Sequence, residues 1–217
     1  MENNEKLFNI PMWPVNAASL VILGIVIQIG GAYLVNAAVT LMDGSTVAAE
    51  YDRYMNAAYS ADTRTLIHIL FVAPLVEEIV FRILFLRAGL LVLPFWAANL
   101  IQAVLFGIYH GTAVQKVYGF LLGLVIGCVF YYCPIIYKKN AANTALRDVP
   151  NSLMGVVITF LLHVVINTSG IYLVPNLPAD IAVPAQIIIG ALLMLVVACV
   201  VYMLKKRVSD INAGGGK

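Results

Sequence analysis

Apolar runs long enough to cross a bilayer recur along this 217-residue chain, separated by short polar segments. Hydrophobic residues make up 62% of the chain and charged residues only 11%. A soluble domain carries about a quarter charged residues, and a membrane-spanning helix needs roughly 20 apolar ones. The sequence therefore predicts an all-α, polytopic membrane helix bundle. We expect about six transmembrane helices, at residues 15–42, 65–88, 94–112, 117–137, 153–174 and 183–204.

The polar segments divide the chain into three parts. Residues 1–64 hold an N-terminal transmembrane helix and a charged connector, 65–174 hold the core helices, and 175–217 hold a C-terminal transmembrane helix and a basic tail. Six crossings place both termini on one side, with nine Lys and Arg residues against three on the other. Since cytoplasmic loops carry the excess of Lys and Arg, we expect both termini in the cytoplasm. These cations form no patch, so the lipid bilayer is an expected partner and nucleic acid is not.

Two acids and a base lie near the middle of the second run. Each charge at a helix centre costs roughly 2.5–3.5 kcal/mol, so such residues normally face a bundle interior or a water-filled cavity. Glu78 and Arg82 are four residues apart, which predicts an ion pair on one helix face. Glu77 lies about 100° away around the axis and has no partner on its own helix. We expect Glu77 to enter a functional site; the alternative is that all three form one packing network.

Two later runs each carry a stripe of polar or aromatic residues. At 100° per residue, one stripe falls on a single helix face and comprises Asn99, Gln102, Phe106 and His110. In the fifth run, His163 and Asn167 are also four residues apart. An amide and an imidazole can donate hydrogen bonds to a carbonyl oxygen as it becomes an oxyanion. The three runs together supply a carboxylate, two imidazoles and an amide, a set that can activate water.

Other conspicuous residues are given no chemical role. His68 precedes Glu77 by nine residues and is expected on the opposite helix face, at the membrane interface. Gly119, Gly123 and Gly127 form a ladder of small residues, which is typical of close helix packing.

The three polar patterns resemble the signatures of the CPBP family of intramembrane proteases. This family includes type II CAAX prenyl proteases and bacteriocin-processing, Abi-like proteins. Its signatures are Glu-Glu-x-x-x-Arg, Phe-x-x-x-His and His-x-x-x-Asn on successive core helices. Here they are Glu77-Glu78-x-x-x-Arg82, Phe106-x-x-x-His110 and His163-x-x-x-Asn167, complete and in order.

The resemblance implies an intramembrane endopeptidase, a hydrolase whose partner is a membrane-associated peptide or protein substrate. By analogy, Glu77 and His110 would position and activate a water, while His163 and Asn167 would hold the oxyanion. The supporting residues would be Glu78, Arg82 and Phe106. The compact size resembles the small bacterial members, which implies a bacterial plasma membrane.

The sequence leaves two questions open. The mechanism implied by the resemblance requires no cofactor, yet a Glu and two His can ligate zinc, and the ligands would then be Glu77, His110 and His163. The function also has alternatives. One is a non-catalytic bacteriocin-immunity or peptide-binding membrane protein of the same fold. Another is a small transporter whose intramembrane acids carry protons or ions, although the chain lacks the repeated halves that are common in transporters.

Overall fold

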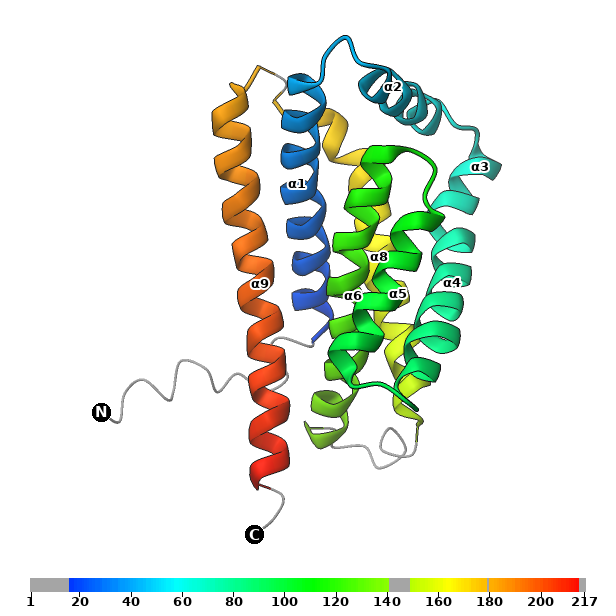
Figure 1. Cartoon of the computed structure of the whole chain (residues 1–217), viewed down its shortest axis with the longest axis vertical. Helices are drawn as coiled ribbons and strands as arrows, with labels where there is room; N and C mark the ends of the chain where they lie inside the picture. Colours follow the sequence, from blue (N-terminus) through cyan, green and yellow to red (C-terminus); the bar gives the residue numbers. More distant parts are fainter. Residues whose placement is uncertain (1–15, 141–148, 179, 215–217) are drawn as a thin grey trace, which may run out of the picture.

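The structure of the protein is a computed structural model, which describes residues 16–140, 149–178 and 180–214. The elements in these ranges are all helical, so the predicted all-α class is confirmed. Four long helices are α1 (Ala17–Leu41), α6 (Ala113–Asn140), α8 (Asn151–Tyr172) and α9 (Val183–Gly214), and they run along the long axis of the bundle (Figure 1). All four are long and apolar enough to cross a membrane. Four of the six predicted spans are therefore confirmed in length and composition.

The two remaining runs differ from the other four. Helix α5 (Phe95–Tyr109) is apolar but has only 15 residues, and it ends before the predicted boundary at residue 112. The run that carries the acids is a helical rod at residues 63–87. The rod consists of α3 (Thr63–Ile67), η2 (His68–Val72), α4 (Ala73–Glu78) and η3 (Ile79–Arg87).

The segments η2 and η3 of this rod are π-helical. A π-turn bonds residues five apart, so it changes the direction of the side chains before it relative to those after it. The expectation that His68 lies opposite Glu77 is wrong for this reason. His68 is exposed, but it lines the same cavity as Glu77.

The charged connector at residues 43–64 contains a helix that the sequence analysis did not predict, α2 (Thr46–Tyr59). The Ser45 side chain caps it by accepting a hydrogen bond of 3.1 Å from the Ala48 N–H. Gly44, with φ of 77°, makes the turn before it. Helix α2 lies across one end of the bundle, whereas α1 begins and α9 ends at the opposite end (Figure 1).

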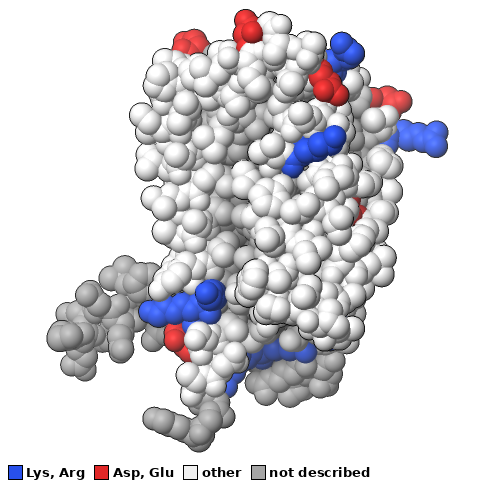
Figure 2. Space-filling model, viewed as in Figure 1, with Lys and Arg blue, Asp and Glu red and all other residues white. Residues whose placement is uncertain are grey.

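The packing is typical of a protein in lipid. The core between the long helices is aliphatic, and it includes Ile27, Ile126, Leu162 and Ile166. Large apolar side chains also face outward, among them Ile188, Leu192 and Leu195 of α9. Charged residues gather toward the two ends of the face in Figure 2, with a broad uncharged band between them. Four apolar helices and this outer surface indicate an integral membrane protein.

Candidate active site

The two adjacent glutamates have different surroundings. Glu78 Oε2 lies 3.0 Å from Arg82 Nε, and both side chains are fully buried. This is the ion pair that the spacing predicted. Glu77 is 12% exposed and lines a cavity, whereas Glu78 does not. The rotation of about 100° between neighbouring helical residues therefore separates a buried carboxylate from one that a ligand can reach.

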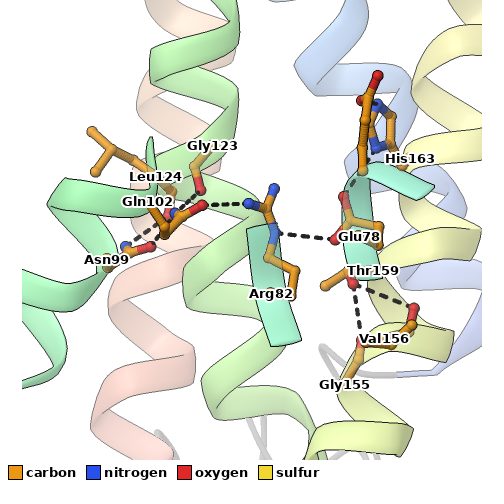
Figure 3. Close-up of polar contacts among 11 residues, drawn as sticks. Glu78, Arg82, Asn99, Gln102, Gly123, Leu124, Gly155, Val156, Thr159 and His163 are labelled. Carbon is orange, nitrogen blue, oxygen red and sulfur yellow. Dashed lines mark hydrogen bonds and ion pairs between the residues drawn. The ribbon is translucent and has the colours of Figure 1, made fainter. Parts of the chain in front are cut away.

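His163 of α8 contacts both carboxylates. Its Nδ1 lies 3.0 Å from Glu78 Oε1 (Figure 3). Its Nε2 lies 3.6 Å from Glu77 Oε2. Since an ionised carboxylate can only accept, Nδ1–H donates to Glu78 and Nε2 faces Glu77. The pairing of Glu78 with Arg82 was expected, but its bond to His163 was not, because the two residues are 85 positions apart.

His110 directly follows the last residue of α5, and its ring is held in a similar way. Its Nδ1 lies 2.7 Å from the Phe106 carbonyl oxygen. A carbonyl oxygen only accepts, so Nδ1 carries the hydrogen, and in the neutral ring Nε2 is left as an acceptor. Both imidazoles are thus fixed through Nδ1.

The Phe106 ring lies between the catalytic candidates. It is fully buried, and it packs edge-on against His110 at 4.8 Å and against His163 at 6.0 Å between ring centroids. The Arg82 guanidinium carbon lies 5.0 Å from the same ring, at cation–π distance. Phe106 therefore fixes the relative positions of three polar side chains that come from three different helical elements.

The glycine ladder of α6 accommodates the polar stripe of α5. A Cβ at Gly119 would lie 2.9 Å from His110 Nδ1, and one at Gly123 would lie 3.2 Å from Phe106 Cδ1. A Cβ at Gly127 would overlap Asn99. The predicted role in helix packing is correct, and the packed partners are the side chains of the candidate site.

A buried hydrogen-bond chain connects this stripe to the glutamates. Arg82 Nη1 donates to Gln102 Oε1, while Gln102 Nε2 donates to Asn99 Oδ1 at 2.7 Å and to the Gly123 carbonyl at 2.9 Å (Figure 3). Asn99 Nδ2 in turn donates to the Leu124 carbonyl at 3.1 Å. Among the described residues, Arg82 Nη2 has no hydrogen-bond partner. The sequence placed Asn99 and Gln102 on an inward face but assigned them no role. The available signal was their helical spacing from Phe106, which follows Gln102 by four residues and Asn99 by seven.

Asn167 bonds to a backbone carbonyl of the rod that lacks its helical hydrogen-bond partner. Its Nδ2 donates to the Ile69 carbonyl at 2.9 Å. In π-helical register this carbonyl would accept from residue 74, and Pro74 has no N–H. Asn167 thereby satisfies an acceptor that the proline leaves open. The amide nitrogen keeps a second N–H.

The four residues predicted to be catalytic line one cavity of about 920 Å³: Glu77, His110, His163 and Asn167. They come from α4, the end of α5, and α8. The cavity continues between the helices to Tyr51 and Met55 of α2. In its wall, Tyr118 donates a hydrogen bond of 2.9 Å to Gln28.

The zinc ligand set that the sequence left open is not found as a metal-binding group among the described residues. Across residues 16–140, 149–178 and 180–214, no three His, Cys, Asp or Glu side chains form a group that can hold a metal ion.

A membrane-type helix bundle with carboxylates and imidazoles around a central cavity defines the class: an integral membrane protein with a buried polar site. Residues 60–169 match the family model described as Type II CAAX prenyl endopeptidase Rce1-like. The match covers half of the chain and all three motifs, and the protein belongs to this family. Comparison with curated proteins and with solved structures finds no match.

Proposed function

We propose that the protein is an intramembrane endopeptidase that cleaves a membrane-associated peptide or protein by attack of an activated water. Family membership implies a peptidase and a peptide or protein substrate. The observation that supports this proposal most is that Glu77, His110, His163 and Asn167 line one cavity. A cavity of about 920 Å³ is large enough for several residues of an extended peptide.

Glu77 and His110 activate the water in this mechanism. The unprotonated Nε2 of His110 accepts one hydrogen of the water and orients it. The Glu77 carboxylate removes the other proton as the water oxygen bonds to the peptide carbonyl carbon. When the tetrahedral intermediate collapses, the C–N bond breaks and Glu77 passes its proton to the leaving nitrogen.

His163 and Asn167 stabilise the oxyanion. Asn167 offers its second Nδ2–H, because the first is bonded to Ile69. His163 donates from Nε2 when its ring carries both protons, since Nδ1–H is bonded to Glu78. Each preorganised donor in a water-poor site stabilises an oxyanion by roughly 2.7–4 kcal/mol, so two donors lower its free energy by several kcal/mol.

The proposal includes six crossings of the bilayer, by α1, the rod, α5, α6, α8 and α9. An even number of crossings agrees with the position of the first residues of α1 and the last residues of α9 at one end of the bundle (Figure 1). The short α5 lies between two turns and packs along α6 through the glycine ladder. We place the protein in a bacterial plasma membrane.

The experiment is reconstitution of the full chain into liposomes with a fluorescently labelled peptide library. The wild-type protein is expected to cleave members of the library, and Glu77→Gln is expected to bind them without cleavage. Binding without cleavage by the wild-type protein would instead support the immunity or peptide-binding function. Proton flux across the liposome without peptide cleavage would support a transporter.

A further inference from the structure

The two ends of the bundle differ in charge. The described cations at the end where α1 begins and α9 ends are Arg87, Lys138, Lys139, Lys205, Lys206 and Arg207. The cations at the end covered by α2 are Arg53, Arg64 and Lys116. We call these the basic end and the α2 end. Three further cations of the sequence, Lys6, Arg147 and Lys217, lie outside the described residues.

The candidate catalytic cavity reaches only one of these ends. It begins at Glu77 and His163 in the interior and extends to exposed residues at the α2 end, namely Asp52, Asn56 and Pro175. None of the described residues that line it belongs to the basic end. The opening of the cavity and the excess of cations are therefore at opposite ends of the membrane helices.

The excess of Lys and Arg in short segments marks the cytoplasmic side of a membrane protein. Arg87, Lys138 and Lys139 lie in the last turns of η3 and α6, and Lys205, Lys206 and Arg207 lie within the last ten residues of α9, all near enough to the helix ends for this rule to apply. We infer that the cavity opens on the side of the membrane away from the cytoplasm. The inference rests on the proposed function, because it assigns a substrate class to the proposed peptidase site.

This orientation restricts the class of substrate. The scissile segment is a peptide, or a loop of a membrane protein, that reaches the extracytoplasmic side. A translocation or membrane-insertion reaction must therefore precede cleavage, and the fragment that lies outside the membrane is released there. A segment that remains in the cytoplasm, lipid-modified or not, meets the basic end and does not reach Glu77.

The test is thiol labelling of intact cells with a membrane-impermeant maleimide. Asn56→Cys places a thiol at the cavity mouth, and Ser209→Cys places one at the basic end; both positions are exposed. The unsubstituted chain is the background control, because it retains a buried Cys133, a half-buried Cys128 and an outward-facing Cys199 within the apolar helix α9. We expect labelling of Asn56→Cys in intact cells, and labelling of Ser209→Cys only after permeabilisation.

The opposite labelling pattern, or labelling of both cysteines in intact cells, would overturn the inference. Asp52→Cys and Asp210→Cys repeat the comparison at exposed neighbouring positions if either variant fails to accumulate. The labelling does not depend on cleavage. A correctly oriented protein without peptidase activity would therefore contradict the proposed function alone, and an active protein of reversed orientation would contradict this inference alone.

Discussion

His163 Nδ1 lies 3.0 Å from Glu78 Oε1, so the glutamate that faces away from the cavity orients an imidazole that faces into it. The neighbouring Glu77 is reached by the other nitrogen of the same ring. Adjacent residues of one helix thus have separable tasks. Glu77 lies where a water and a substrate can bind, and Glu78 holds His163 and Arg82 in place.

The two glutamates should therefore respond differently to the same substitution. Glu77→Gln removes the proposed base without breaking the buried ion pair. Cleavage should fall by about 10²–10⁴-fold with little change in melting temperature. Glu78→Gln leaves Arg82 buried without its counter-charge, which costs roughly 3–5 kcal/mol, so both stability and cleavage should fall. The measurements are the cleavage rate and the melting temperature of each variant in detergent.

A double variant is the control for this prediction. Replacing Glu78 by Gln and Arg82 by Met together removes both charges, so it should regain part of the stability lost in Glu78→Gln. Normal cleavage by Glu77→Gln would contradict the assignment of the base. Unchanged stability of Glu78→Gln would contradict its structural role.

Gln102 should be needed to keep Arg82 in position. Gln102→Leu leaves Arg82 Nη1 without its acceptor, at a cost of about 1–3 kcal/mol, and frees the guanidinium to shift. The shift of Arg82 should displace Glu78 and His163, and this displacement should lower the cleavage rate by up to about 100-fold. Gln102→Glu keeps an acceptor for Arg82 and should restore part of the activity. The matched control is Gln186→Leu, which removes a buried glutamine that is bonded to Asn36 and to the Ile181 carbonyl and has no contact with the Arg82 network. Equal losses of activity in both leucine variants would show that Gln102 acts only through general stability.

Two glycines of the α6 ladder should have different effects when replaced by alanine. A methyl group at Gly119 meets His110 Nδ1 at 2.9 Å, so Gly119→Ala should displace the ring and lower cleavage. Its melting temperature should stay close to the wild-type value, because alanine favours a helix over glycine by about 0.8–1.0 kcal/mol. Gly127→Ala overlaps Asn99 within the buried network and should lower the melting temperature instead. Wild-type cleavage by Gly119→Ala would show that the position of His110 does not limit the reaction.

Cleavage should continue at an unchanged rate after treatment with a zinc chelator. The reason is that no group of three metal-binding residues occurs in the described part of the chain. The measurement compares cleavage rates before and after treatment with phenanthroline. Loss of activity that is reversed by zinc and not by other divalent ions would contradict this prediction.

Much of the site could be predicted because it depends on spacing within single helices. The Glu78–Arg82 pair follows from a separation of four residues, and the inward direction of Gln102 and His110 follows from 100° per residue. The family signatures supplied the grouping of the motifs. Their contacts could not be derived in this way, because the bond between His163 and Glu78 depends on how α8 packs against the rod.

Other features departed from the prediction for local reasons. The π-helical turn at His68–Val72 changes the phase of the rod, and ideal helix geometry therefore misplaced His68. Helix α2 has no apolar run, so the pattern that predicts membrane spans does not predict it. The sequence feature that indicates this helix is Ser45, an N-cap residue before an alanine-rich segment. The glycine ladder was recognised as a packing surface, but sequence alone does not show which side chains it accommodates.

The buried network also has a consequence for biosynthesis. The rod at residues 63–87 emerges from the ribosome before two of its polar partners, since Gln102 follows Arg82 by 20 residues and His163 follows Glu78 by 85. As an isolated segment it holds one ion pair, Glu78 with Arg82, and one further charge, Glu77, which costs roughly 2.5–3.5 kcal/mol at a helix centre. The polar contacts of this segment are therefore complete only after α5 and α8 have been synthesised. A nascent chain truncated before α8 leaves Glu78 without His163, so the candidate site is completed late in the synthesis of the protein.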